Sequence, residues 1–240
     1  MSEQARTEDV LSLLERGELR TLGLMPRASN YTFLAEITDG DRRALAVYKP
    51  RDGEAPLWDF PEGTLCKREV AAYEVSRELG WPSIPPTVLR DGPHGPGSVQ
   101  QFIRFDPAEH YFSLRESRLE DFRAVAAFDV VVNNADRKGG HCLLGEDGAI
   151  WVIDHGVCFA VEPKLRTVIW EFAGEPLPAT ACRDLARLGE SLRRGEARGR
   201  LEKLLSRREL DSCADRVEGL VRAGRFPQPD SRRPYPWPPL

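Results

Sequence analysis

The feature that most constrains this chain is a pair of aspartates, each at the end of a segment that has the pattern of a buried element. Residues 119–132 are mostly apolar with helical spacing and lead into a polar run that contains Asp136. Apolar stretches at 142–144 and 150–153 flank a turn and predict a hairpin, directly followed by Asp154. Because a hairpin reverses the chain, the sequence predicts that these two carboxylates, 18 residues apart, meet at one cleft.

Strand signals dominate the first part of the chain. Asp39-Gly40 is a pair typical of tight turns, and it separates two β-rich segments that therefore predict a hairpin. Residues 65–79 predict a helix that stops at Gly80. The expected strands before residue 107 are 31–37, 44–48, 87–90 and 98–105.

Helical signals dominate the second part. Beyond Thr180 the apolar residues have helical spacing, and Ser206 to Glu209 fits a capping box that opens a last helix. A short helix capped by Thr7 and ending near Gly17 opens the chain. The change from strands to helices predicts two lobes, an N-lobe at 1–106 and a C-lobe at 107–226.

The tail at 227–240 holds six prolines in 14 residues. This composition predicts an extended, polyproline-like segment, because proline fixes its own φ angle and has no backbone N–H to donate. The sequence leaves open whether the tail docks on the protein or projects from it.

The two aspartates suit phosphoryl transfer, in which an enzyme mainly positions the reactants and holds a divalent metal against the phosphates. Asp136 would lie beside the nucleophile, and Asp154, which opens an Asp-His-Gly turn, would bind the metal. His141 lies five residues after Asp136, where kinases carry a further metal ligand. Lys49 ends an Ala-Val-Tyr-Lys strand segment and Glu69 follows it on a helix, as the paired lysine and glutamate of kinases do.

Together these motifs resemble a known family. Asn133-Asn134-Ala135-Asp136-Arg137, followed by Ile153-Asp154-His155-Gly156-Val157-Cys158-Phe159, resembles the N-x-D-R … I-D-x-G-x-x-F signature of type II phosphatidylinositol 4-kinases. HipA-type protein kinases carry a similar N-x-D-R. Over roughly residues 20–220 the chain is similar to small actinobacterial proteins of the phosphatidylinositol 3-/4-kinase-like type. The resemblance implies a two-lobed, protein-kinase-like α+β fold with a strand-rich N-lobe and a mainly helical C-lobe.

The resemblance also implies ATP and Mg²⁺ or Mn²⁺ as cofactors, and it assigns roles to ten residues. The catalytic pair would be Asp136 and Arg137, and the metal ligands would be His141 and Asp154. His141 departs from the kinase pattern, which has Asn there, and imidazole suits Mg²⁺ less well than an oxygen donor does. The residues expected to bind the nucleotide are Ser29 and Asn30 in a turn, Lys49 with Glu69, and Gln101 with Phe102 in a hinge.

Composition excludes several other classes of protein. Acidic residues outnumber basic ones 38 to 34, which argues against nucleic acid as the partner. No apolar run reaches the ~20 residues of a membrane span, so the sequence predicts no stable membrane insertion. The chain starts with a polar segment, and its five cysteines lack CxxC spacing, which predicts a cytoplasmic protein with reduced thiols.

The acceptor and the chemistry stay open at this level. Residues 157–181 hold only Lys164 and Arg166 as basic residues, which disfavours a polyphosphoinositide headgroup and leaves a protein hydroxyl, a small molecule or another lipid. The first alternative is a nucleotide-binding pseudokinase that acts as an interaction module, suggested by His141 and by the glycine-poor turn at 25–30. The second is nucleotidyl transfer on the same fold. Oligomeric state is not predicted.

Overall fold

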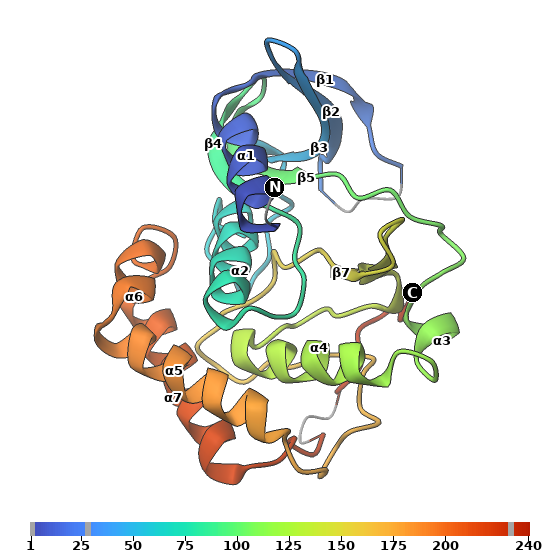
Figure 1. Cartoon of the computed structure of the whole chain (residues 1–240). Coiled ribbons are helices and arrows are strands. Elements are labelled where there is room, and N and C mark those ends of the chain that lie inside the picture. Colours follow the sequence, from blue (N-terminus) through green and yellow to red (C-terminus); the bar gives the residue numbers. More distant parts are fainter. Residues whose placement is uncertain (1–2, 27–29, 230–232) are drawn as a thin grey trace.

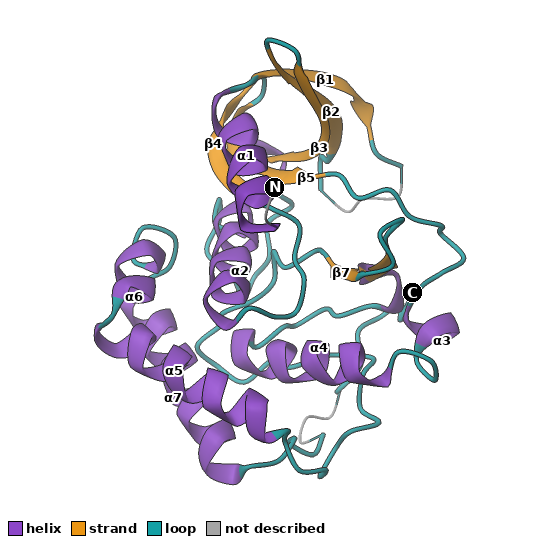
Figure 2. Cartoon of the chain, in the orientation of Figure 1, coloured by secondary structure: helices purple, strands orange, loops and turns teal. Residues whose placement is uncertain are grey.

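The structure is a computed structural model that describes residues 3–26, 30–229 and 233–240. Figure 1 shows a strand-rich N-terminal part above a helical C-terminal part, and Figure 2 shows that nearly all strands belong to the former. The predicted two-lobed α+β fold is confirmed. Within the described ranges, no helix combines the length and the apolar character needed to cross a bilayer.

The N-terminal part is built on one antiparallel sheet with the strand order β1-β2-β3-β5-β4. Small and branched residues alternate inward along β2, where Ala35 and Ile37 are fully buried. The helix α1 (Glu3–Arg16) packs Leu13 and Leu14 into the same small core. The strands are β1 (Glu18–Leu24), β2 (Phe33–Asp39), β3 (Arg42–Pro50), β4 (Thr87–Gly92) and β5 (Gly95–Gln101).

The helix α2 (Leu65–Leu79) connects this sheet with the rest of the molecule. Its N-terminus is capped from a distance by Glu54, whose carboxylate accepts the backbone N–H groups of Leu65 and Cys66 at 3.0 and 2.8 Å. Gly80 ends it in the left-handed conformation, with φ 85°. Although α2 lies between β3 and β4 in the sequence, its buried face belongs to the large core of the C-terminal helices.

The C-terminal part surrounds that large core with helices and one small hairpin. Its apolar centre comes from α4, where Phe122, Phe128 and Val131 are fully buried. The elements are α3 (Tyr111–Leu114), α4 (Leu119–Val132), β6 (Cys142–Leu144), β7 (Ile150–Val152), α5 (Ala179–Arg194), α6 (Glu196–Leu201) and α7 (Arg207–Ala223). Single 3₁₀ turns lie at η1 (Arg51–Gly53) and η2 (Gly139–His141).

Several predicted elements are confirmed with their bounds, and others differ. The helices at 65–79 and 119–132, the hairpin before Asp154 and the capping box of α7 are all present. The strand β1 was not predicted, because it is an exposed edge strand with a weak apolar pattern. The first helix begins at Glu3, before Thr7, since good helix formers precede that threonine.

The fifth strand also ends earlier than predicted. The segment expected to run to residue 105 leaves the sheet after Gln101, and the last sheet contact is from the Phe102 N–H to the Leu45 carbonyl at 3.0 Å. The division of the chain at residue 106 stays a prediction.

Candidate active site

Lys49 occupies the centre of the site. The side chain leaves β3 and its Nζ forms an ion pair with Glu69 on α2 and lies 2.9 Å from Oδ1 of Asp154. The Lys49 ammonium holds the pKa of the Asp154 carboxyl well below its usual range, although burial opposes this. Burial would lower the pKa of Lys49, but the two carboxylates outweigh it and raise that pKa. The three residues expected from the spacing of the motifs therefore meet.

Glu69 also fixes the backbone beside Asp154. One carboxylate oxygen of Glu69 pairs with Lys49, while the other, Oε2, accepts the backbone N–H of His155 at 2.8 Å. Asp154 itself has φ 62°, a left-handed conformation that side chains rarely adopt and that is found at functional sites. Glu69 thus positions the strand lysine and the Asp154 turn together.

The loop that carries Asp136, residues 133–141, starts from a sharp end of α4. Asn133 stops the helix in the left-handed conformation, φ 53°, which asparagine tolerates better than most residues. The Asn134 side chain then accepts the Asp136 backbone N–H at 2.9 Å and donates to Asp129 at 3.0 Å. These contacts hold the loop at its start, and the Asp136 side chain that follows is partly exposed to solvent.

Asp136 has the properties of a general base. Its side chain is 35% exposed and lies 3.6 Å from the ammonium of Lys138. Burial raises the pKa of Asp136 to about 6, the charge of Asp154 adds to this, and Lys138 opposes it. A carboxylate with this pKa is mostly ionised at neutral pH, and its pKa is close enough to that pH for it to accept a proton.

Arg137, expected to act in catalysis beside Asp136, lies elsewhere. Its guanidinium is fully buried, forms a forked ion pair with Asp129 at 3.0–3.1 Å and donates to the Ile153 carbonyl at 2.9 Å. A third contact joins it to Nε2 of His155 at 2.7 Å. Arg137 therefore faces the core and positions the two aspartate-bearing segments.

Asp129 is the partner that the sequence reasoning missed. It is fully buried in α4 and accepts hydrogen bonds from Arg137, Asn134 and Thr167, the last at 3.1 Å. The signal was available, because Asp129 is the charged residue that interrupts the apolar run at 124–132. A carboxylate buried in such a helix needs charged or polar partners, and those define the loop that follows.

His141 contacts Asp154, but as a hydrogen-bond donor. The imidazole Nδ1 accepts the Lys138 backbone N–H at 3.3 Å, and Nε2 lies 3.2 Å from Oδ2 of Asp154. Burial lowers the pKa of His141 to about 4, so the ring is neutral at pH 7. With Nδ1 accepting, the single ring proton belongs on Nε2 and points at Asp154. In this arrangement His141 orients the carboxylate, and its expected role as a metal ligand stays a prediction.

The donor set still fits a divalent ion bound mostly by a nucleotide. Within the described part of the chain, no three His, Cys, Asp or Glu side chains are grouped so as to hold a metal. Asp154 is 46% exposed and keeps one face toward solvent. Mg²⁺ in nucleotide sites is commonly held by one or two carboxylates together with phosphate oxygens and waters, which is compatible with Asp154.

The expected nucleotide contacts are used differently. Ser29 lies outside the described residues. The amide oxygen of Asn30 accepts the Ala55 N–H at 2.7 Å, so Asn30 ties its turn to the loop that follows β3. The backbone N–H groups of Gln101 and Phe102 already donate to Pro86 and Leu45.

Comparison with known proteins assigns the fold to a class. In three dimensions the chain resembles Golgi casein kinase, with a TM-score of 0.56 and 15% identity over 95% of this chain and 81% of that chain. A structure of Golgi casein kinase with Mn/ADP bound gives a TM-score of 0.54 and 14% identity over 96% and 81%. The fold is therefore kinase-like. No protein-family model matches the chain.

Sequence comparison identifies the family. The chain is 38% identical over 266 residues to Protein Rv2133c of Mycobacterium tuberculosis (strain ATCC 25618 / H37Rv), covering 96% of this chain and 95% of that protein. The chain belongs to the same family as Protein Rv2133c. It is also 28% identical over 170 residues to phosphatidylinositol 4-kinase gamma 4 of Oryza sativa subsp. japonica, covering 59% of this chain and 30% of that protein. The resemblance to phosphatidylinositol 4-kinases is confirmed as a distant one.

Proposed function

We propose that this protein is an ATP- and divalent-metal-dependent phosphotransferase that moves the γ-phosphoryl group of ATP to a hydroxyl group. The observation that carries the proposal is the contact of Lys49 with both Glu69 and Asp154 in a kinase-like fold. A strand lysine held by a helix glutamate, next to a metal-binding aspartate, is the arrangement that kinases need around the nucleotide.

Lys49 and Glu69 bind and orient the phosphates in this proposal. Lys49 stays charged because of its two carboxylate neighbours, and it carries donors that reach phosphate oxygens when ATP enters. Glu69 keeps the ammonium aligned throughout. Asp154, oriented by His141, would hold the divalent ion, whose positive charge neutralises the phosphate oxygens. The Mn/ADP complex of the similar Golgi casein kinase supports this choice of cofactors.

Asp136 handles the proton of the acceptor. As the acceptor oxygen forms its bond to the γ-phosphorus and the bond to the β-phosphate oxygen breaks, the hydroxyl proton passes to the Asp136 carboxylate. The products are ADP and a phosphate ester. Arg137 does not touch the reactants and instead holds the Asp136 and Asp154 segments in register.

Adenine would be bound at the end of the expected hinge, residues 99–103. Since the N–H groups of Gln101 and Phe102 are already used, the next backbone N–H in the chain is that of Ile103, which is half-buried. We place the adenine contact there.

The test uses γ-labelled and, separately, α-labelled ATP with Mg²⁺ or Mn²⁺ and the purified protein. ADP release and transfer of the γ-label, both lost in Asp136→Asn and Asp154→Asn, are the expected results. Asp147→Asn, in the exposed turn between β6 and β7, is the control that retains activity. Pyrophosphate with transfer of the α-label would indicate nucleotidyl transfer. Nucleotide binding with no turnover under either metal would indicate a pseudokinase.

A further inference from the structure

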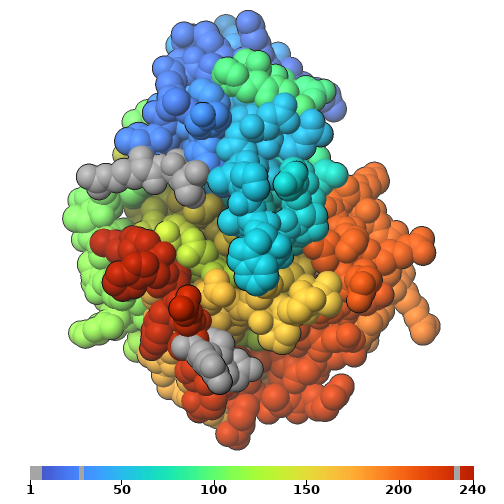
Figure 3. Space-filling view, turned by 180° about the vertical axis from the view of Figure 1, so that it is seen from behind, coloured from blue at the N-terminus to red at the C-terminus, as the bar shows by residue number. Residues whose placement is uncertain are grey.

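The proline-rich tail lies against the loop that carries Asp136. The carbonyl of Pro239 accepts the Gly139 N–H at 2.8 Å, and the carbonyl of Pro234 accepts the Thr167 N–H at 3.0 Å. The indole N–H of Trp170 donates to the same Pro234 carbonyl at 3.1 Å. Figure 3 shows the tail in red on the surface beside the green α3 segment. The tail is therefore docked through its backbone.

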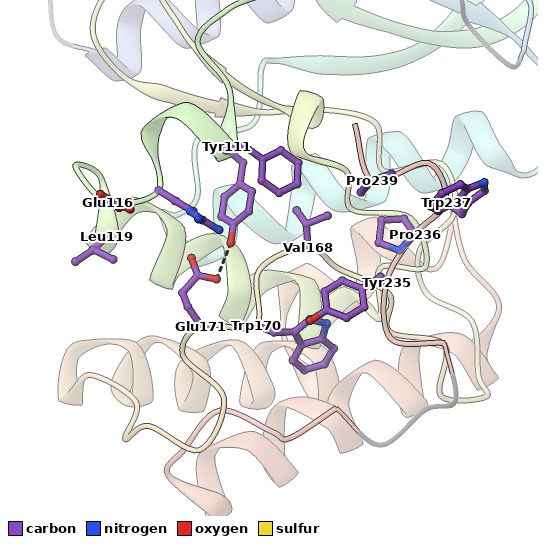
Figure 4. A pocket seen from close by; sticks show the side chains of 12 residues that line it. Tyr111, Glu116, Leu119, Val168, Trp170, Glu171, Tyr235, Pro236, Trp237 and Pro239 are labelled. Carbon is purple, nitrogen blue, oxygen red and sulfur yellow. Dashed lines mark hydrogen bonds between the residues drawn. The ribbon is translucent and has the colours of Figure 1, made fainter.

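The tail packs against an aromatic groove and forms one of its walls. A cavity of about 820 Å³ lies between α3 and the tail, and Figure 4 shows the aromatic rings around it. One wall holds Tyr111, whose hydroxyl donates to Glu171 at 2.7 Å. Pro236 is buried, whereas Pro238 is exposed. On the side facing the tail, the cavity is lined by Tyr111, Phe112, Val168, Trp170 and Glu171, and we refer to these residues as the tail groove.

We propose that the tail groove is the acceptor-binding site, that it takes an extended, proline-containing peptide, and that the tail occupies it in cis. This proposal rests on the proposed function and narrows its acceptor to a polypeptide. It assigns the tail a role that the sequence left open.

The position of the groove supports this assignment. Gly139 lies three residues after Asp136, and Thr167 pairs with Arg137, the residue directly after Asp136, in an isolated β-bridge. The tail hydrogen-bonds to both segments, and the contact of Pro239 with Gly139 brings the end of the tail beside the loop that carries Asp136. A hydroxyl carried by a peptide in the same path would reach the Asp136 carboxylate from the solvent side.

Gly139, in the loop that carries Asp136, lies directly against Phe112 of the tail groove. A Cβ atom at Gly139 would lie 2.6 Å from the ring of Phe112, closer than real Cβ contacts allow. The absence of a side chain therefore lets α3 approach the Asp136 loop directly. The same Cβ would lie 3.5 Å from Cδ1 of Leu240 in the tail.

The chemistry of the groove favours a peptide over a lipid headgroup. The donors to the tail are the backbone N–H groups of Gly139 and Thr167 and the indole N–H of Trp170, and all three bind carbonyl oxygens. Proline has no backbone N–H, so its carbonyl is the only backbone group that needs a hydrogen-bond partner. Aromatic grooves with such donors are a known way to bind polyproline segments. Arg115 in the lining is balanced by Glu116 and Glu171, which disfavours an anionic headgroup.

The first experiment measures binding without catalysis. A fluorescent peptide with the sequence of residues 233–240 is titrated into full-length protein and followed by anisotropy. Pro236→Asp places a charge at the buried proline and should release the tail, so that this variant binds the peptide at least tenfold more tightly than the wild type. Pro238→Asp makes the same change at an exposed proline and should bind as the wild type does. Equal binding by all three proteins overturns the proposal.

A second variant tests the groove itself. Trp170→Phe in the Pro236→Asp background keeps the aromatic ring but removes the indole N–H, and it should weaken peptide binding severalfold. Hydrogen exchange at the Gly139 and Thr167 amides should be faster in Pro236→Asp than in Pro238→Asp. Unchanged exchange there, together with unchanged peptide binding, would show that the tail is not held as the structure has it.

The last arm links the groove to transfer. With labelled ATP and dephosphorylated casein as acceptor, Pro236→Asp should lower the KM for casein and leave the KM for ATP unchanged, and the unlabelled peptide should compete with casein. Transfer to phosphatidylinositol vesicles that the peptide does not inhibit would overturn the acceptor role. Peptide binding with no ATP turnover in any variant would also overturn the acceptor role of the tail groove. Because the groove would still bind the peptide, this result would show that the proposed phosphotransferase function is wrong.

Discussion

Arg137 and His155 meet in the core, with the guanidinium Nη2 2.7 Å from the imidazole Nε2. Each is the residue directly after one of the two aspartates of the site, so this contact links the Asp136 loop to the Asp154 turn. Burial lowers the pKa of His155 well below its usual value, and the ring is neutral, with Nε2 accepting from Arg137. The distance between Asp136 and Asp154 therefore depends on the buried contact between Arg137 and His155.

Loss of Arg137 should destabilise the fold. Arg137→Leu leaves the buried Asp129 carboxylate without its charged partner, for which a loss of about 3–5 kcal/mol is expected. The measurement is urea unfolding followed by circular dichroism. Arg42→Leu, which removes an exposed ion pair with Asp39, is the control and should change stability by less than about 1 kcal/mol. Similar losses in both variants would contradict the role assigned to Arg137.

The lysine–glutamate pair should affect transfer more than folding. Lys49→Met removes the charge that faces the phosphates, and a drop in kcat of about 10²-fold or more is expected, as for other groups that stabilise transition-state charge. Glu69→Gln keeps the size of the side chain but weakens the hold on Lys49, so it should lose less. Steady-state assays with ATP check both. A Glu69→Gln loss as large as that of Lys49→Met would contradict this ranking and would show that transfer depends equally on the contact of Glu69 with the His155 N–H.

The rate should depend on the protonation of Asp136. Burial raises the pKa of this carboxyl to about 6, and only its ionised form accepts the acceptor proton. We therefore expect kcat/KM to fall roughly tenfold per pH unit below about pH 6 and to be level between pH 7 and 8. A pH–rate profile at saturating metal is the measurement. An acid limb near pH 4 would exclude Asp136 as the group that controls the rate.

The same shift predicts an effect on stability. The pKa of Asp136 is about 6 in the folded protein, above the ordinary aspartate value of 3.8, so the folded state binds the proton more tightly than the unfolded state. Stability should therefore decline as the pH rises from about 4 to about 6. Asp136→Asn removes this penalty and should raise stability by about 1 kcal/mol at pH 7.5, after discounting for solvent screening, and by less at pH 4. Thermal unfolding at the two pH values tests this, and an equal gain at both would contradict it.

His141 should influence metal binding through Asp154. His141→Leu removes the donor that orients the carboxylate, and we expect metal affinity to fall by roughly 10–100-fold. His141→Asn keeps a donor for Asp154 and an acceptor for the Lys138 N–H, so it should retain most of the affinity. Titration of activity with Mg²⁺ and Mn²⁺ compares the two variants. If Asn fails as badly as Leu in Mn²⁺ while Mg²⁺ binding is unaffected, then His141 binds the metal directly.

Local patterns in the sequence were enough to predict much of the fold. The apolar spacing of residues 119–132, the turn signals around the hairpin before Asp154 and the capping box of α7 each act over a few residues, and all three are confirmed. The pairing of Lys49 with Glu69 was expected from the kinase pattern of a strand lysine followed by a helix glutamate, and the two side chains form an ion pair.

Only the tertiary structure decided which polar groups are buried and which partners they have. Arg137 and Asp136 are neighbours in sequence, yet Arg137 is buried in the core and Asp136 is partly exposed, because the partners of Arg137 come from α4 and from the Asp154 segment. The docking of the tail depends in the same way on N–H groups at Gly139 and Thr167, about 70 to 100 residues away. Such contacts follow from packing between distant segments, whose free energy no local pattern in the sequence contains.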